Sequence, residues 1–132
     1  MKLVIGGYAQ GKLDYVLNGN RLQDFCIADG ELPNVEQLKD EKSNGKTVIV
    51  NHFHEWMRGS IRQGKNAEQE ILEFISNEPS CIVISDEIGN GIVPIDSFER
   101  QYRERTGRIL VRLAEQADEV VRVVCGIGQR IK

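Results

Sequence analysis

The chain has 132 residues, of which 40% are hydrophobic and 28% are charged. These proportions are typical of a soluble globular protein and exclude a disordered or fibrous chain. The length suits one domain of ordinary size, so we expect a single domain over residues 1–132. With 17 basic and 20 acidic side chains the net charge is −3, which favours neither nucleic acid nor an anionic membrane as a partner.

Membrane segments and disulfides are not expected. No apolar run reaches the roughly 18 residues of a membrane-spanning helix, and the apolar run at Leu3–Ile5 is shorter than the core of a signal peptide. We therefore expect a cytoplasmic protein. The cysteines Cys26, Cys81 and Cys125 lie far apart, in or beside apolar runs. This spacing suits neither a disulfide framework nor a metal site, so we expect three buried, reduced thiols.

Five short apolar runs alternate with segments of helical pattern along the chain. They are Lys2–Ile5, Phe25–Ala28, Thr47–Val50, Cys81–Ser85 and Val120–Cys125. None shows the strict alternation of apolar and polar residues that marks a half-exposed strand. Buried strands separated by helices are typical of a parallel sheet covered on both sides. The sequence therefore predicts an α/β fold, with a mostly parallel five-stranded sheet and helices on both faces.

Two helices carry a clear start signal, a side-chain oxygen followed three residues later by Gln or Glu. One begins at Asn66 and should end near Pro79; the other begins at Asp96 and should run for about twenty residues. A shorter helix is expected over Asn34–Lys42. The long helix should bury Phe98, Tyr102, Ile109, Leu113 and Ala117 and expose the ion pairs Glu99–Arg103 and Glu104–Arg108.

A glycine-rich loop follows the first predicted strand and matches G-x-x-x-x-G-K before a short helical pattern. Such glycines let backbone N–H groups surround a phosphate, the helix N-terminus adds positive charge, and the lysine contacts the outer phosphates. We expect ATP or GTP to bind here, with Lys12 as the catalytic residue. The predicted nucleotide-binding residues are Gly6, Gly7, Tyr8, Ala9, Gln10, Gly11, Lys12 and Leu13. The alternative is a glycine-rich turn with an incidental lysine.

The second half of the chain carries a family resemblance. Ser85-Asp86-Glu87-Ile88-Gly89-Asn90-Gly91-Ile92-Val93-Pro94 resembles the N-E-V-G-x-G-I-V-P segment of the adenosylcobinamide kinase / adenosylcobinamide-phosphate guanylyltransferase family. The resemblance continues through Tyr102-Arg103-Glu104 and Gly107-Arg108 to the ending Val123–Lys132. It implies a P-loop NTPase-like α/β domain of cobalamin biosynthesis. It further implies phosphoryl transfer to the aminopropanol hydroxyl of adenosylcobinamide, then guanylylation of the product, in a homo-oligomer.

A second loop of the same pocket is predicted after the fourth strand. Glu87, Gly89 and Gly91 follow that strand, and ligands of open parallel sheets bind beyond the carboxyl ends of the strands. The alternative is that these glycines only shape the backbone.

Four departures from the family pattern concern chemistry. Leu13 replaces the Ser or Thr whose hydroxyl holds Mg²⁺, and Asn51 stands where the family's D-C-L-T has an acid. We therefore expect no metal-ligating residue in the chain, with Mg²⁺ held mostly by the nucleotide and water. Leu110-Val111 replaces an Asn-Gln pair, and no histidine precedes His52, although the family's guanylylated histidine lies between the second and third strands.

Two functions therefore stay open. The first is a kinase that has lost guanylyl transfer, and the second is a non-catalytic nucleotide- or corrinoid-binding regulator. The role of His52 and His54 is also open. In a continuing strand the two rings would face one way, near Glu55, whereas in a helix beginning at Phe53 they would diverge. A metal site, a ligand contact and a packing role are the alternatives.

Overall fold

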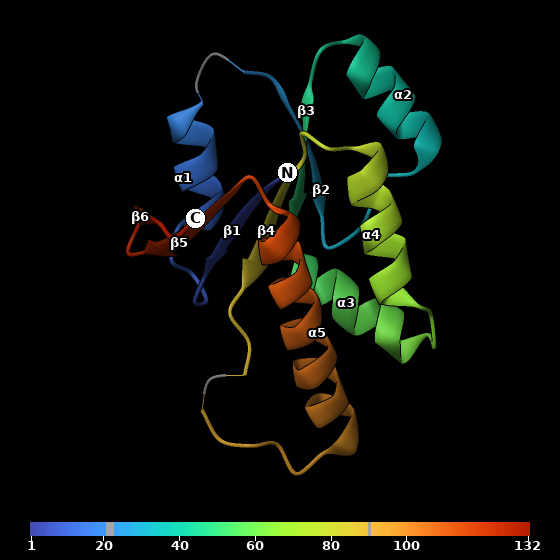
Figure 1. Cartoon of the computed structure of the whole chain (residues 1–132), viewed down its shortest axis with the longest axis vertical. Helices are drawn as coiled ribbons and strands as arrows, with labels where there is room; N and C mark the ends of the chain where they lie inside the picture. The colour runs from blue at the N-terminus through green and yellow to red at the C-terminus, as the bar shows by residue number, and fades with distance from the viewer. Residues whose placement is uncertain (21–22, 90) are drawn as a thin grey trace.

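The computed structural model describes residues 1–20, 23–89 and 91–132. Within them, the strands are β1 (Lys2–Gly6), β2 (Phe25–Asp29), β3 (Thr47–Asn51), β4 (Ile82–Asp86), β5 (Glu119–Val124) and β6 (Ile127–Arg130). They form one sheet in the order β2-β3-β4-β1-β5-β6 (Figure 1). Strands β1 to β5 are parallel, and β6 pairs antiparallel with β5. The five predicted strands and the α/β class are confirmed.

Helices cover both faces of the sheet, as predicted. They are α1 (Lys12–Gly19), α2 (Val35–Ser43), α3 (Phe53–Arg62), α4 (Ala67–Asn77) and α5 (Ser97–Gln116). Helix α1 lies on one face and the other helices lie on the opposite face (Figure 1). The larger core therefore packs against α2 to α5, with Phe53, Met57 and Ile71 fully buried, and the smaller core packs against α1 around Val16. In the described residues, no helix has the length and apolar character to cross a bilayer.

The strand β6 was not predicted from the sequence. Cys125 and Gly126, with φ of 50° and 76°, turn the chain back after β5. The strand itself, Ile127–Arg130, is short and mostly exposed, because it lies at the edge of the sheet. It therefore lacks the buried apolar run by which the other strands were found.

The expectation of three buried thiols is wrong for two of the cysteines. All three are free, but only Cys81 is buried; Cys26 is half-buried and Cys125 is exposed. Cys26 lies on the edge strand β2, and Cys125 lies in the turn between β5 and β6. Burial raises the pKa of Cys81 to about 12, so its thiol stays protonated.

The start signals of α4 and α5 act as predicted. Asn66 accepts a hydrogen bond from the Gln69 backbone N–H (3.2 Å), and α4 ends two residues before Pro79. Asp96 accepts hydrogen bonds from the backbone N–H groups of the first turn of α5, at 2.7 and 3.2 Å. Helix α5 buries Tyr102, Ile109 and Leu113.

One predicted ion pair of α5 is replaced by a contact between helices. Glu99 binds Arg58 of α3 through two hydrogen bonds of 2.6 and 3.2 Å. The guanidinium of Arg58 also lies 4.5 Å from the centre of the Tyr102 ring. Arg103, the expected partner of Glu99, donates instead to the carbonyl of Ile92. Tertiary packing overrides the local pairing here, whereas the exposed pair between Glu104 and Arg108 forms as predicted.

Two glycine substitutions should change stability in opposite directions. A Cβ atom at Gly6 would lie 2.5 Å from the carbonyl oxygen of Val123, so Gly6→Ala should lower the free energy of unfolding by about 1–3 kcal/mol. A Cβ atom at Gly107 in α5 would meet no heavy atom within 4 Å. Gly107→Ala should therefore raise the free energy of unfolding by about 0.5–1 kcal/mol. Urea unfolding of both variants checks the pair; equal effects would contradict the close approach of β1 to β5.

Candidate functional site

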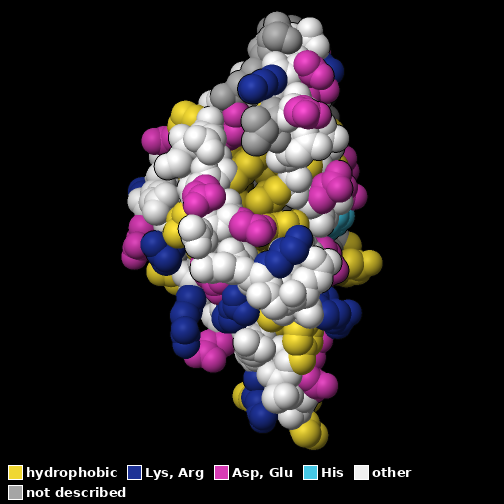
Figure 2. All heavy atoms as spheres, turned by 90° about the vertical axis from the view of Figure 1, so that its right-hand side faces the viewer, with side chains coloured by type: hydrophobic (Ala, Val, Ile, Leu, Met, Phe, Trp, Pro, Cys, Tyr) yellow, Lys and Arg dark blue, Asp and Glu magenta, His cyan; other side chains and the backbone are white. Residues whose placement is uncertain are grey.

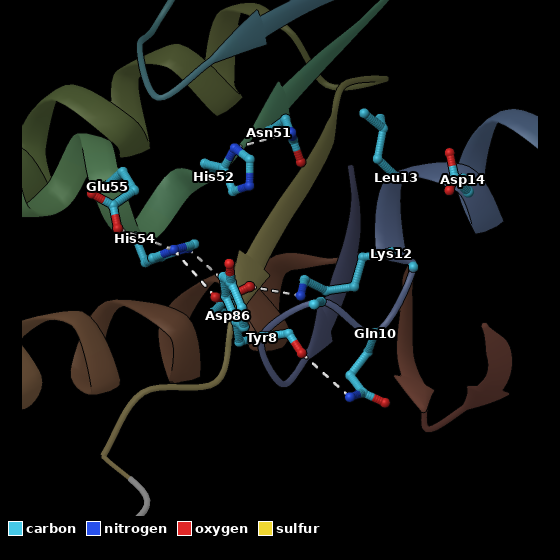
Figure 3. A pocket seen from close by; sticks show the side chains of 12 residues that line it. Tyr8, Gln10, Lys12, Leu13, Asp14, Asn51, His52, His54, Glu55 and Asp86 are labelled. Atoms are coloured by element: carbon cyan, nitrogen blue, oxygen red, sulfur yellow. Dashed lines mark hydrogen bonds and ion pairs between the residues drawn. The ribbon is translucent and has the colours of Figure 1, made fainter. Parts of the chain in front are cut away.

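The candidate site is a cavity of about 530 Å³ at the carboxyl ends of β1, β3 and β4, beside the start of α1 (Figure 3). Its wall combines backbone of the glycine-rich loop with a lysine, two histidines and three carboxylates. The lining residues are Tyr8, Ala9, Gln10, Gly11, Lys12, Leu13, Asp14, Asn51, His52, His54, Glu55 and Asp86. This edge of a parallel sheet is where the fold places ligands.

A second cavity lies between α2 and α4 and has a different chemical character. It measures about 580 Å³, and Leu32, Leu38 and Phe74 line it. Figure 2 shows this face, where an apolar hollow is surrounded by acidic side chains. Glu70 and Glu73 are among the lining residues. None of the described lining residues of this cavity belongs to the glycine-rich loop, so the chemistry predicted for that loop belongs to the first cavity.

Most of the predicted loop residues line the first cavity. Tyr8 to Leu13 lie in its wall, and Gly11, with φ of 80°, precedes the first residue of α1. The turn after β5 holds this loop from outside: Gly126 N–H donates to the Gln10 carbonyl (2.8 Å) and Cys125 N–H donates to Gln10 Oε1 (2.7 Å). Gly6, the last residue of β1, and Gly7, whose carbonyl accepts from Lys12 Nζ, are not among the described lining residues.

Lys12 and Asp86 form the central ion pair of the cavity. Lys12 Nζ lies 2.6 Å from Asp86 Oδ1 and donates to the carbonyl oxygen of Gly7, also at 2.6 Å. The side chains of Lys12 and Asp86 are only 7% and 15% exposed. Asp86 was missed among the predicted site residues. It is the last residue of β4 and lies beside Gly6 of β1 in the sheet register, which brings it to the loop.

His54 contacts both the backbone and the carboxylate of Asp86. Its Nδ1 accepts a hydrogen bond from the Asp86 backbone N–H (3.1 Å), and its Nε2 lies 3.4 Å from Asp86 Oδ2 and 3.5 Å from Glu55 Oε1. Burial lowers the pKa of His54 against the opposing effect of these two carboxylates. The ring is therefore neutral near pH 7, with its proton on Nε2.

The lowered pKa of His54 should make stability depend on pH. Above the ordinary histidine pKa of 6.5, neither the folded nor the unfolded chain protonates this ring. As the pH falls, the unfolded chain binds the proton before the folded chain does, so the free energy of unfolding should decrease between about pH 7 and pH 5. Urea unfolding across this range should show a smaller decrease for His54→Asn, whose amide oxygen can still accept from Asp86. An unchanged pH dependence would contradict this account.

The ends of β2 and β3 carry a second polar group. Asp29 and Asn51 are paired in the sheet register, and Asn51 Nδ2 donates to Asp29 Oδ1 (3.0 Å). His52 Nδ1 contacts the same carboxylate oxygen. Helix α3 begins at Phe53, so the alternative of a continuing strand is wrong. Within the described residues, no group of three or more His, Cys, Asp or Glu side chains could hold a metal ion.

The predicted second loop is not part of the described cavity wall, and this segment contributes Asp86 instead. The residue after Asp86, Glu87, forms an ion pair with Arg122 of β5 at 2.7 Å. Its backbone N–H donates to the carbonyl of Gly6 (2.8 Å). Gly89 and Gly91 both have φ of 100°, so their conformations favour glycine for a turn. Positive φ values are what the alternative of a backbone-shaping role requires, and a role of this loop in ligand binding stays a prediction.

The chain has recognisable relatives. The family model described as cobinamide kinase / cobinamide phosphate guanyltransferase (CobU) matches residues 18–131, a range that begins after the glycine-rich loop. The bifunctional adenosylcobalamin biosynthesis protein CobU of Salmonella typhimurium is 47% identical over 84 residues, covering 62% of this chain and 46% of that protein. The protein of the same name from Escherichia coli is 39% identical over 80 residues, covering 59% and 44%.

A third relative, the bifunctional adenosylcobalamin biosynthesis protein CobP of Pseudomonas aeruginosa, is 27% identical over 101 residues, covering 72% of this chain and 58% of that protein. The chain thus spans about half the length of the curated relatives it matches. The fold agrees with the P-loop NTPase-like domain that the resemblance implied. Because the family model matches most of the chain, the protein belongs to the cobinamide kinase / cobinamide phosphate guanyltransferase family.

Proposed function

We propose that this chain binds ATP or GTP in the first cavity and transfers the terminal phosphoryl group to the hydroxyl group of adenosylcobinamide. The observation that carries the proposal is the position of Lys12. Its amine lies in the wall of a cavity next to the start of α1, inside a loop whose glycines free the backbone N–H groups. A helix N-terminus with an adjacent lysine is suited to a polyphosphate.

The phosphates would replace the present partners of Lys12. Its ammonium group is held by Asp86 and by the carbonyl of Gly7, and both contacts are short enough to place it at the base of the loop. A bound triphosphate offers a larger negative charge at the same place. Lys12 would then offset the charge that develops on the outer phosphates during transfer, and the loop would hold them in position.

The donor groups around the loop fit a magnesium ion held by one carboxylate. Leu13 offers no oxygen, and Asn51, whose Nδ2 donates to Asp29, offers only a neutral amide oxygen. Asp86 lines the cavity and supplies a carboxylate beside Lys12. Mg²⁺ commonly binds through one or two carboxylates together with phosphate oxygens and water, so Asp86 would hold it here. When bound, Mg²⁺ neutralises charge on the outer phosphates. This revises the expectation that the protein offers no ligand.

Guanylyl transfer is proposed to be lost. The chain has two histidines, His52 and His54, and the segment between β2 and β3 contains neither. His54 is 8% exposed and contacts Asp86 through its backbone and its carboxylate. His52 contacts Asp29. The resemblance gives no guanylylated histidine at either position.

Incubation with adenosylcobinamide and ATP or GTP labelled at the γ-phosphate tests the proposal. We expect label in adenosylcobinamide phosphate and no product that contains GMP. Nucleotide binding without any labelled product would contradict the kinase function. That result would favour the non-catalytic regulator, for which Leu13 is the supporting observation, because it removes the usual hydroxyl ligand of Mg²⁺.

A further inference from the structure

We infer that the Asp29–His52 pair is the general base of this site, which removes the proton from the acceptor hydroxyl. The inference rests on the proposed phosphoryl transfer and adds the residues that activate the acceptor. His52 lies in the cavity wall with Lys12 and Asp86. It comes from the end of β3, and Asp29 comes from the end of the neighbouring strand β2. His52 thus shares the cavity wall with the loop that would hold the donor, and Asp29 contacts it from the neighbouring strand end.

The hydrogen bonds of the pair select one form of the imidazole. His52 Nδ1 contacts the Asp29 carboxylate. An ionised carboxylate has no proton to donate, so the proton of this hydrogen bond belongs to Nδ1. Nε2 makes no hydrogen bond to any of the described residues, and its lone pair is then available as a base. Figure 3 shows the His52 ring beside Asn51, among the side chains that line the cavity. This arrangement is the one a general base needs, with one nitrogen oriented by a carboxylate and the other accessible.

Asn51 completes the arrangement. Its Nδ2 donates to the same oxygen of Asp29, at 3.0 Å, and lies 3.2 Å from His52 Nδ1. Two hydrogen-bonding contacts on one carboxylate oxygen fix the orientation of that carboxylate. Asn51 is 5% exposed, and a carboxylate at this position would face Asp29 across the register pair. The amide at Asn51 is thus explained by the Asp29–His52 pair.

The backbone of His52 supports a role for its side chain. Its φ of 51° lies in the left-handed region, which costs a residue with a Cβ atom about 1 kcal/mol or more. His52 precedes the first residue of α3, yet its side chain makes no capping hydrogen bond to that helix. Glycine or asparagine would meet the backbone requirement at lower cost. The strained conformation instead places an imidazole in the cavity wall.

The transfer step then balances as follows. The acceptor O–H bond breaks and its proton moves to Nε2 of His52. The acceptor oxygen forms a bond to the γ-phosphorus, while the bond from that phosphorus to the bridging oxygen breaks. The nucleoside diphosphate leaves with the electron pair of that bond. Asp29 stabilises the imidazolium ion, which returns its proton to water.

Replacement of His52 by glycine gives the sharpest test, because glycine adopts a positive φ without strain. We expect His52→Gly to fold, to bind ATP or GTP with wild-type affinity, and to lower kcat for transfer to adenosylcobinamide by about 10²–10⁴-fold. Added imidazole should restore part of kcat. Asp29→Asn should also lower kcat. Glu104→Gln, in an exposed ion pair on α5, is the control and should leave kcat unchanged.

Nitrogen-15 NMR of the unliganded wild-type chain provides a readout that needs no activity. The chemical shifts should show His52 protonated at Nδ1 and unprotonated at Nε2, and Asp29→Asn should mix the two neutral forms. Protonation at Nε2 in the wild type would overturn the inference. A wild-type kcat in His52→Gly, or a loss of kcat that imidazole does not restore, would overturn it too. A covalent nucleotidyl group on His52 would show a nucleophile instead of a base.

The two proposals fail in different measurements. Absence of nucleotide binding or of transfer by the wild-type chain contradicts the proposed function and removes the reaction that the pair would serve. Normal binding and transfer by His52→Gly contradict only the role of the pair.

Discussion

Lys12→Met should weaken the binding of ATP and GTP by about 10- to 100-fold and should abolish most of the phosphoryl transfer. A hydrogen bond from a charged group in a buried site contributes about 1.5–3 kcal/mol, which corresponds to this range of affinity. Lys12 is 7% exposed, so water screens its charge little. Methionine keeps most of the aliphatic packing and removes the ammonium group. Fluorescence titration with a labelled nucleotide measures the change.

Two controls separate charge from folding. Lys46→Met removes a partly exposed lysine that pairs with Glu41 at 2.9 Å, before the start of β3, and should leave nucleotide affinity unchanged. Lys12→Met alone leaves the Asp86 carboxylate without its closest cation, which is destabilising in a buried pair. The double variant Lys12→Met/Asp86→Asn removes both charges. It should remain folded and should still bind nucleotide more weakly than the wild type. Wild-type affinity in either Lys12 variant would show that the loop does not bind phosphate.

Asp86→Asn should strengthen nucleotide binding without Mg²⁺ and remove most of the further strengthening that Mg²⁺ gives. Without the metal, Asp86 repels phosphates and competes for Lys12, at 2.6 Å. Its removal should therefore strengthen binding, by about tenfold for a change of 1.4 kcal/mol. With the metal, the variant lacks the carboxylate that would hold Mg²⁺, so the strengthening by Mg²⁺ should be much smaller than in the wild type. Calorimetric titration of ATP in both buffers measures the two affinities.

Glu55→Gln is the matched control for this experiment. Glu55 also lines the cavity, but its side chain is 57% exposed, so solvent screens its charge more strongly. Its replacement should change both affinities less than Asp86→Asn does. If Asp86→Asn keeps the full strengthening by Mg²⁺, Asp86 does not hold the metal. If Asp86→Asn weakens nucleotide binding without Mg²⁺, Asp86 does not compete with the phosphates for Lys12.

Local patterns were enough to predict much of the fold. The strands β1, β3, β4 and β5 were visible as β-branched apolar runs, and the starts of α4 and α5 followed from Asn66 and Asp96. The glycine-rich loop was equally clear, because its glycines, lysine and following helix are adjacent in the chain. The prediction of the Glu99–Arg103 pair was wrong because the actual partner of Glu99, Arg58, belongs to another helix and is distant in the chain.

The rest of the candidate site depends on strand order. Asp29, Asn51 and Asp86 are the last residues of three separate strands. Local periodicity does not show that β4 lies between β1 and β3, or that β2 lies beside β3. These neighbours place Asp86 against Lys12 and Asp29 against His52. The family segment around Asp86 is recognisable in the sequence, but its pattern points to Gly89 and Gly91, which are outside the described cavity wall.

Equilibrium dialysis of the wild-type chain against radiolabelled ATP and GTP, with and without Mg²⁺, tests the central claim most directly. The account predicts one bound nucleotide per chain with micromolar affinity, strengthened by Mg²⁺ and weakened in Lys12→Met. Absence of binding to both nucleotides at millimolar concentration would contradict it, because the cavity formed by the loop, Lys12 and Asp86 would then not be a nucleotide site.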